Sequence, residues 1–285
     1  MFGYIESFFS DPRNTLIFFL LAFPGRVLAL SVHEFAHAWM ANRCGDPTAR
    51  LMGRMTINPL KHLDLLGTIM MLLVGYGWAK PVPVNPNNFR DYRKDDLKVS
   101  IAGVTMNFIM FVLSMLLMFS MIALALARIP VLDVNAVQNA PVFRASYSGI
   151  ESIFKLESDG YYVIPLSVLL NQMPYASDYL IAPVFGTVVG FLYQMVGYFA
   201  VTNFILMVFN LLPVPPLDGY HVFNDLVLRR SLFVNARTAY ICQGIMMILV
   251  FTGILGEGLG WLNDQVLRGA GSLAAAILRA MGLMS

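Results

Sequence analysis

Two histidines and a glutamate stand close together near the start of the chain, in the segment SVHEFAHAWM. His33 and His37 are four residues apart, so on a helix both imidazoles project from one face and can reach one zinc ion at about 2 Å. Glu34 lies beside them on the same turn. In this H-E-x-x-H pattern, zinc lowers the pKa of a bound water and the glutamate takes its proton. The pattern predicts a hydrolytic zinc site with Glu34 as the general base.

The surroundings of this motif make a chance occurrence a weak explanation. The three residues lie inside a long apolar run, residues 15–40, that suits a membrane span. Ionisable side chains inside a transmembrane helix are costly and usually serve a function. Three of them within five positions are hard to explain as packing, so the location supports the metal-site interpretation.

A third zinc ligand must come from elsewhere, because a catalytic zinc site typically takes three protein ligands and a water. After another apolar run the chain reads NLLPVPPLDGYHVFNDL, in which Asp218 follows a proline-rich break. A carboxylate at a broken membrane-helix end can face a buried cavity. His221, about one helical turn later, is a competing ligand, and Asp218 would also suit a helix N-cap. The spacing modestly favours Asp218 and leaves His221 open.

The composition of the chain indicates a membrane protein. Of its 285 residues, 58% are hydrophobic and 13% are charged, and the mean hydropathy is +0.66, well above the usual range for soluble domains. Four apolar runs are long enough to cross a bilayer, which takes roughly 20 residues. We expect membrane spans at about residues 15–40, 97–127, 181–212 and 239–255.

Shorter segments between these runs complete the predicted architecture. Residues 65–78 are apolar but too short to span, so we expect a re-entrant segment. Residues 48–58 alternate imperfectly between two turn signals and predict a short membrane-surface strand or hairpin. Residues 128–180 predict an external loop, and residues 259–283 predict an interfacial helix. The expected fold is an all-α polytopic membrane protein with a small β-strand or re-entrant segment.

Charged residues predict the orientation in the membrane. Residues 43–98 hold nine of the nineteen lysines and arginines, whereas residues 128–180 hold three. Cytoplasmic loops are enriched in both residue types, so the connection after the first span is expected inside and the N-terminus outside.

Three further features argue against a nucleic-acid partner, a cysteine-based site and a cleaved signal peptide. The net charge of +2 does not suggest a nucleic-acid partner. Cys44 and Cys242 lack the spacing of a disulfide framework or a cysteine zinc site. The N-terminus lacks the basic start and cleavage site of a signal peptide, so we expect the first apolar run to remain in the mature protein.

Taken together, these residues resemble the site-2 protease family of intramembrane zinc metalloproteases, in particular its compact branch without PDZ or CBS domains. The resemblance covers about residues 28–226. It rests on four ordered motifs, HEFAHAWMANRCGDPTARLMGRMTINPLKHLDLLGT, GWAKPVPVNPNNFR, AGVTMN and NLLPVPPLDGYHV. One departure is Val104, which stands where relatives usually carry proline and puts the local helix shape in doubt.

The resemblance implies one zinc ion per chain, held by His33, His37 and Asp218, in a core of three membrane helices near the cytosolic face. It thereby selects Asp218 over His221. Asn107 and Asn210 match the asparagines of two family motifs and are implied to hold the substrate backbone or the developing oxyanion. Hydrogen bonding between membrane helices is the alternative role for both amides.

The resemblance also implies that His62 and Asp64, in the stretch NPLKHLD, position structure or substrate and do not bind metal. A part in orienting the metal ligands stays open for them.

The expected activity is hydrolysis of peptide bonds within or near transmembrane segments, by a single membrane-embedded peptidase domain over residues 1–285. The alternatives are a zinc-binding transporter and a non-catalytic membrane scaffold. The expected partners are a transmembrane substrate and the lipid bilayer, with a regulatory membrane protein or a second copy of the chain as further candidates. A prokaryotic cell membrane is the expected location.

Overall fold

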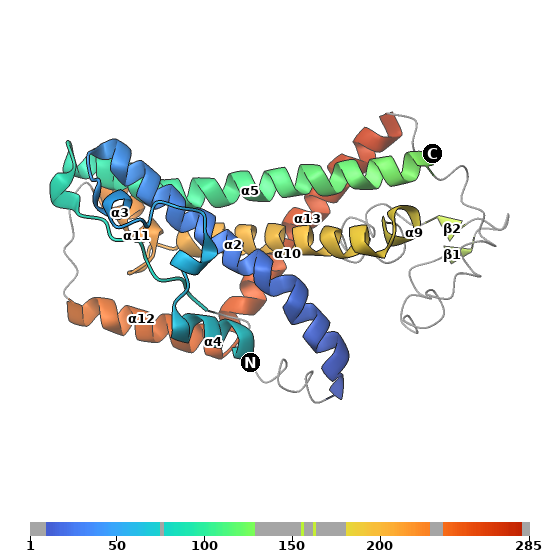
Figure 1. Ribbon diagram of the computed structural model, residues 1–285, viewed down its shortest axis with the longest axis horizontal. Helices are drawn as coiled ribbons and strands as arrows, with labels where there is room; N and C mark the ends of the chain where they lie inside the picture. Colours follow the sequence, from blue (N-terminus) through green and yellow to red (C-terminus); the bar gives the residue numbers. More distant parts are fainter. Residues whose placement is uncertain are drawn as a thin grey trace. The chain divides into compact units, whose positions relative to one another are not determined.

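The structure is a computed structural model that describes residues 10–74, 77–128, 155–156, 162–163, 181–228 and 236–280. Helices dominate this part of the chain (Figure 1), and the predicted all-α fold is confirmed. The longer helices are α2 (Pro12–Cys44), α4 (Leu65–Val74), α5 (Tyr92–Arg128), α10 (Thr187–Asn210), α12 (Ala236–Phe251) and α13 (Ile254–Ala280). The shorter elements are α3 (Thr48–Leu51), η1 (Pro59–Lys61), η2 (Pro86–Asn88), α9 (Ala182–Phe185), α11 (Asp218–Phe223), the π-helical η5 (Asn224–Leu228), and the strands β1 (Lys155–Leu156) and β2 (Tyr162–Val163).

The chain divides into two compact units. The first comprises Met1–Leu113 and Tyr198–Trp261, and the second comprises Ser114–Gly197 and Leu262–Ser285. Every residue of the predicted site belongs to the first unit. In the second unit, β1 and β2 pair antiparallel, with Lys155 opposite Val163.

Three helices are long and apolar enough to cross a membrane. They are α2 over Thr15–Cys44, α5 over Tyr92–Ala125 and α10 over Thr187–Asn210. Each leaves large apolar side chains exposed, among them Leu20, Phe108 and Leu192, as lipid contact would require. The run at residues 239–255 corresponds to α12, whose 16 residues extend about 24 Å. This length falls short of a hydrocarbon core of about 30 Å.

These three helices pack pairwise within the first unit. A Cβ on Gly25 of α2 would lie 3.1 Å from the backbone nitrogen of Phe199 on α10, so the two backbones approach closely there. The rings of Phe111 on α5 and Phe204 on α10 lie 5.3 Å apart. Gly103 brings α5 against α2 at the imidazoles of the motif. The result is a three-helix core, as the resemblance implied.

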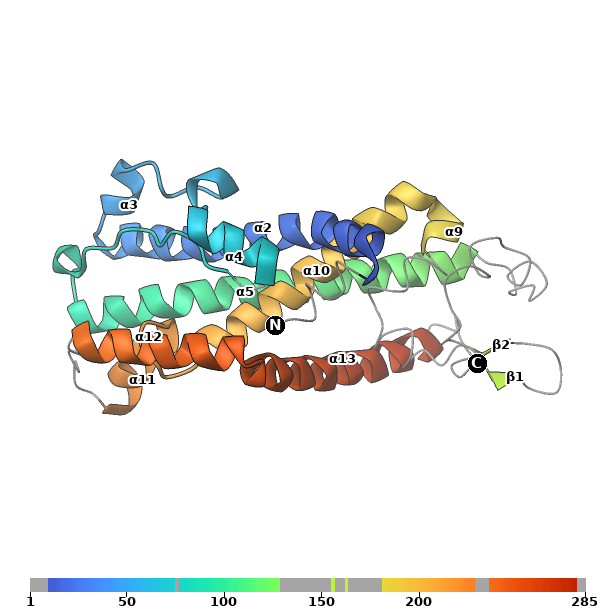
Figure 2. The same cartoon turned by 90° about the horizontal axis from the view of Figure 1, so that it is seen from below.

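The connection from α2 to α5 packs back along α2 through α3, η1 and α4 (Figure 2). The strand or hairpin predicted for residues 48–58 is wrong, because Thr48–Leu51 forms the helical turn α3. Pro47 is the N-cap of this turn, and just before it the Asp46 carboxylate accepts a hydrogen bond from the Thr48 amide. Gly53 ends it with φ +64° and donates to Arg50, while Arg54 donates to Ala49. That pair of bonds is the Schellman arrangement, which ends a helix.

The two ends of the segment predicted to be re-entrant lie side by side. α4 occupies Leu65–Val74, and Leu63 then forms an antiparallel bridge with Ala79. The Lys80 amide donates to the His62 carbonyl at 2.7 Å. Entry into the membrane stays a prediction for this segment.

The structure describes little of the predicted external loop and most of the predicted interfacial tail. Apart from Arg128, β1 and β2, the expected external loop at 128–180 lies outside the described residues. The expected interfacial tail at 259–283 corresponds to α13, one continuous helix that ends at Ala280.

Candidate metal centre

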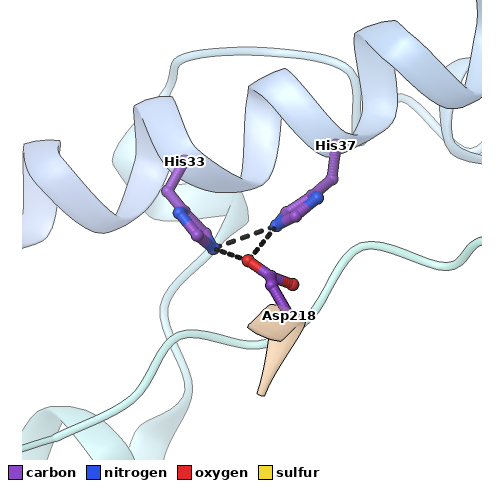
Figure 3. A group of neighbouring side chains, drawn as sticks. All are labelled: His33, His37 and Asp218. Atoms are coloured by element: carbon purple, nitrogen blue, oxygen red, sulfur yellow. Dashed lines mark hydrogen bonds and ion pairs between the residues drawn. The ribbon is translucent and has the colours of Figure 1, made fainter. Parts of the chain in front are cut away.

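The structure brings His33, His37 and Asp218 together, although Asp218 is far from the histidines in sequence (Figure 3). Both histidines are buried on α2 and point their Nε2 atoms toward the carboxylate of Asp218 at the start of α11. The two Nε2 atoms are 2.9 Å apart. The Asp218 Oδ2 atom lies 3.4 Å from His33 Nε2 and 3.3 Å from His37 Nε2. Three potential ligand atoms therefore surround one point.

This arrangement fits a tetrahedral zinc ion. Two ligand atoms bound to zinc at 2.0–2.1 Å lie roughly 3.3 Å apart in a tetrahedral site, close to the three separations found. Apart from its contacts with the two imidazoles, the buried Asp218 Oδ2 atom has no hydrogen-bond partner among the described residues, although a buried carboxylate oxygen normally requires one. Two imidazoles, one carboxylate and a water form a familiar catalytic zinc donor set.

The turn after α10 positions Asp218. Leu217 is the N-cap of α11, and Asp218 is its first residue, so the carboxylate does not serve as the cap. A Cβ on Gly219 would lie 2.6 Å from the Leu212 carbonyl oxygen, so only glycine allows α11 to fold this closely against the end of α10. This tight turn directs Asp218 back toward α2.

The competing residue His221 makes a different contact. Its Nδ1 atom lies 3.0 Å from the Asp96 carboxylate on α5. Asp96 therefore raises the pKa of His221 above its ordinary value, against the opposing effect of burial. For Asp218, burial alone would raise the pKa, but the neighbouring imidazoles of His37 and His33 outweigh it and lower the pKa.

Groups from α5 hold the far side of both imidazoles. His37 Nδ1 lies 2.8 Å from the Val99 carbonyl oxygen, and His33 Nδ1 lies 3.1 Å from Asn107 Nδ2. Between these contacts, a Cβ on Gly103 would come within 2.6 Å of His33 Cε1 and 2.7 Å of His37 Cε1, and closer still to His37 Nε2. Gly103 therefore leaves the space that the two imidazoles occupy.

Glu34 is held by a backbone amide from an extended segment, residues 79–84. The Val82 N–H donates to Glu34 Oε2 at 2.7 Å. Arg54 fixes the segment by donating from Nη2 to the carbonyl oxygens of Lys80 at 2.7 Å and Pro81 at 3.3 Å. Glu34 is thus oriented beside the three potential ligands.

The two predicted asparagines have different surroundings. Asn107 is fully buried and contacts His33, as described above. Asn210 is the half-buried last residue of α10, and among the described residues its side chain makes no hydrogen bond to the metal-site cluster. Of the two residues matched to NPLKHLD, His62 bonds through Nε2 to the Thr56 carbonyl oxygen and Asp64 accepts from the Gly67 amide. Both contacts fasten the connection between α2 and α5.

Sequence reasoning missed two contacts and one buried amide. The role of the Val82 amide was missed, although the alternation Pro81-Val82-Pro83 leaves a single N–H there and was a usable signal. The Asp96–His221 pair was missed because it joins residues 125 positions apart. Asn203 is fully buried in α10, donates to the Phe199 carbonyl and carries a side-chain oxygen without a partner.

The chain is similar to one peptidase family and to proteins named as zinc metalloproteases. The model of peptidase family M50 matches residues 18–253. The chain is 31% identical over 201 residues to "Putative zinc metalloprotease YwhC" of Bacillus subtilis (strain 168), covering 70% of this chain and 66% of that protein. It is 33% identical over 107 residues to "Putative zinc metalloprotease Rip2" of Mycolicibacterium smegmatis, covering 36% of this chain and 41% of that protein. The matches thus span just under two thirds and about two fifths of these relatives. No solved structure matches the chain.

Proposed function

The chain belongs to peptidase family M50, and from that premise we propose that it is an intramembrane zinc metalloprotease. It hydrolyses peptide bonds within or near transmembrane segments of membrane proteins. The observation that carries this proposal is the convergence of His33, His37 and Asp218 next to Glu34, inside a core of apolar helices. The site-2 protease resemblance of the four sequence motifs supports the same conclusion.

In the proposed site, His33, His37 and Asp218 hold one zinc ion per chain. When bound, zinc supplies a Lewis acid that polarises the substrate carbonyl and makes a water molecule acidic enough to react near neutral pH. The side chain of Asp218 remains 18% exposed although its Oδ2 atom is buried, and water is proposed to approach the cluster from this side.

Glu34 carries the proton transfers. It takes a proton from the attacking water while the water oxygen bonds to the carbonyl carbon. It then gives that proton to the amide nitrogen as the carbon–nitrogen bond breaks. The Val82 N–H holds one carboxylate oxygen, Oε2, and leaves the other oxygen of Glu34 to exchange the proton.

The substrate must become locally extended before it can react. A helical transmembrane peptide hides its carbonyl groups in its own hydrogen bonds, so substrates with helix-breaking residues should be cut best. Asn210, at the end of α10, is proposed to contact the substrate backbone. The membrane-facing helices and the distribution of basic residues support a multi-pass membrane protein with its site near the cytosolic face. A prokaryotic cell membrane is the proposed location, since both relatives come from bacteria.

The geometry favours hydrolysis over the two rival functions. A metal transporter would need ligands along a pathway, yet within the described ranges His33, His37 and Asp218 are the one cluster with metal-binding spacing. A scaffold would not need a carboxylate oriented by a backbone hydrogen bond beside such a cluster.

The decisive experiment measures cleavage of a model transmembrane substrate by the purified protein in detergent, together with its zinc content. We expect about one zinc per chain, and we expect Glu34→Gln to keep the zinc and lose cleavage. Glu257→Gln on α13 serves as a matched control and should leave both unchanged. Zinc binding without cleavage of several helix-destabilised substrates would favour a transporter or scaffold, and a protein that binds no zinc would refute the site.

A further inference from the structure

We propose that the connection between α2 and α5 carries a docking surface for anionic lipids. The surface combines two basic residues with four apolar ones, namely Lys61, Lys80, Ile57, Leu60, Leu65 and Leu66. The inference rests on the membrane location in the proposed function, and it involves none of the metal ligands.

The apolar part of this surface is strongly exposed. Four large apolar side chains stand out within ten residues, Ile57 at 56%, Leu60 at 76%, Leu65 at 80% and Leu66 at 59%. Single exposed apolar side chains are normal, but a cluster of them marks an interaction surface. The other side of α4 is already occupied, because a Cβ on Gly67 would lie 3.0 Å from Trp78 Cδ1. The exposed side therefore indicates a lipid or protein neighbour.

Two lysines adjoin these apolar side chains. The Lys80 amide donates to the His62 carbonyl oxygen at 2.7 Å, so Lys80 lies beside the residue that follows Lys61. Both lysines are exposed, and neither belongs to an ion pair within the part of the chain that the structure describes. Asp64, the acid nearest to Lys61 in sequence, accepts a hydrogen bond from the Gly67 amide at 2.8 Å. Two positive charges are thus available to an anionic group.

An anionic lipid matches both parts of the surface. Its phosphate pairs with the lysine ammonium groups, while the boundary between headgroup and acyl chain covers the apolar side chains. The connection begins where the membrane-crossing helix α2 ends at Cys44, on the side predicted to be cytoplasmic, and the cytoplasmic leaflet carries anionic lipids. A second copy of the chain fits less well, since a symmetric pair through this surface would bring the same lysines together.

The surface is joined to the extended segment that orients Glu34. Arg54 donates to the Lys80 carbonyl oxygen at 2.7 Å, and two residues later the Val82 amide donates to Glu34. A headgroup that binds the Lys80 side chain also restrains this segment. Anionic lipid should therefore raise kcat without changing the zinc content.

Quenching of Trp78 fluorescence measures which lipid lies at the surface. Trp78 is half-buried two residues before Lys80, and Trp39→Phe with Trp261→Phe leaves it as the one tryptophan of the chain. The full chain is reconstituted in phosphatidylcholine vesicles that contain an equal fraction of either brominated phosphatidylglycerol or brominated phosphatidylcholine. We expect stronger quenching by the anionic lipid, with a smaller difference in about 1 M salt, where charges are screened.

Substitutions of the two lysines identify the source of this preference. In this background, Lys61→Gln with Lys80→Gln should lower the relative binding constant for the anionic lipid by about fivefold per lysine, the attraction expected for one basic residue at an anionic leaflet. Lys61→Arg with Lys80→Arg keeps both charges and should keep the preference. Lys94→Gln is the matched control, because Lys94 is exposed in the same connection but is paired with Asp91 at 3.0 Å.

The link to Glu34 has its own measurement. The kcat for a model transmembrane substrate should be higher in vesicles with phosphatidylglycerol than in phosphatidylcholine alone. This difference should vanish in the double glutamine variant, while its zinc content stays the same. Equal kcat in both kinds of vesicle would refute the link.

The remaining outcomes separate lipid docking from its rivals. Equal quenching by both lipids would overturn the inference. Quenching by neither lipid would also overturn it and would indicate that a second copy or another protein covers the surface. An equal loss of preference in Lys94→Gln would overturn it too, since net charge alone would then explain the attraction. Failure of the protein to bind zinc or to cleave any substrate would instead refute the proposed function and leave the lipid preference intact.

Discussion

Replacing Gly103 with alanine tests how closely α5 is fitted to the metal site. The added Cβ would meet His33 Cε1 at 2.6 Å and His37 Cε1 at 2.7 Å. Ordinary carbon–carbon contacts begin near 3.5 Å, so the added Cβ and the imidazole carbons would have to move apart by roughly 1 Å. The added Cβ is bonded to the α5 backbone and cannot move away by itself. Either the two imidazoles must shift, or α5 must move away from α2.

The cost can be worked out from this overlap. Overpacking a close-packed site costs typically about 1–3 kcal/mol. If the imidazoles move to relieve it, the same free energy is lost from zinc binding, and at about 1.4 kcal/mol per factor of ten the affinity falls by roughly 5–150-fold. Glycine-to-alanine replacement within a helix also stabilises by about 0.5–1 kcal/mol. The expected signature is a large loss of zinc affinity with a small change in the stability of the metal-free protein.

Chelator competition and thermal unfolding in detergent measure the two quantities separately. The matched control is Gly244→Ala on α12, where a Cβ would meet no atom within 4 Å and only the helix-propensity gain applies. Wild-type zinc affinity in Gly103→Ala would refute the proposed contact between α5 and the metal ligands. A loss of the same size in Gly244→Ala would show that the assay reports a general effect.

Two further predictions concern the hydrogen bonds that hold Glu34 and the loop after α2. Val82→Pro removes the amide that donates to Glu34. A hydrogen bond to a charged group contributes about 1.5–3 kcal/mol, so kcat should fall at least tenfold with zinc content unchanged. Val82→Ala keeps the amide and should retain kcat. Asp46→Ala leaves the amides of Thr48 and Asn85 without their acceptor and should lower the free energy of unfolding by about 1–3 kcal/mol. Burial alone would raise the pKa of Asp46, but these hydrogen bonds outweigh it and lower the pKa in the folded protein. The stability that Asp46 adds to the wild type is therefore present above the ordinary aspartate pKa. It is lost as the pH falls through the lower pKa of the folded protein. Unfolding curves that shift equally with acid in wild type and Asp46→Ala would contradict this assignment.

The features that depend on neighbouring residues could be predicted from the sequence. Apolar runs predicted the three helices that are long and apolar enough to cross a membrane, and the i, i+4 spacing predicted that His33 and His37 share a face of α2. The helices extend beyond the apolar runs, since α2 continues to Cys44 and α5 already begins at Tyr92. Hydropathy cannot detect such ends, because charged residues continue a helix readily once it leaves the apolar phase.

The strand prediction failed where local turn contacts outweighed an alternation pattern. At residues 48–58 the alternation suggested a strand, but the Asp46 carboxylate at the start and the left-handed Gly53 at the end favour one helical turn. Both residues were visible in the sequence as turn formers. Their spacing of seven residues leaves room for a single helical turn and its ends. The alternation pattern alone does not indicate such a turn.

The contacts that orient the motif could not be predicted, because each comes from a different element. His37 is held by a carbonyl of α5, and Glu34 by an amide of the extended segment at residues 79–84. The nearest carboxylate to both imidazoles is Asp218, from the turn after α10. The H-E-x-x-H spacing alone supplies two ligands and an unoriented base. A metal centre therefore requires the packed three-helix core, and in a water-poor interior no solvent molecule readily replaces a lost partner. This is why a substitution at Gly103, which would not touch the metal, should affect zinc binding more than substitutions of equal size elsewhere on the same helices.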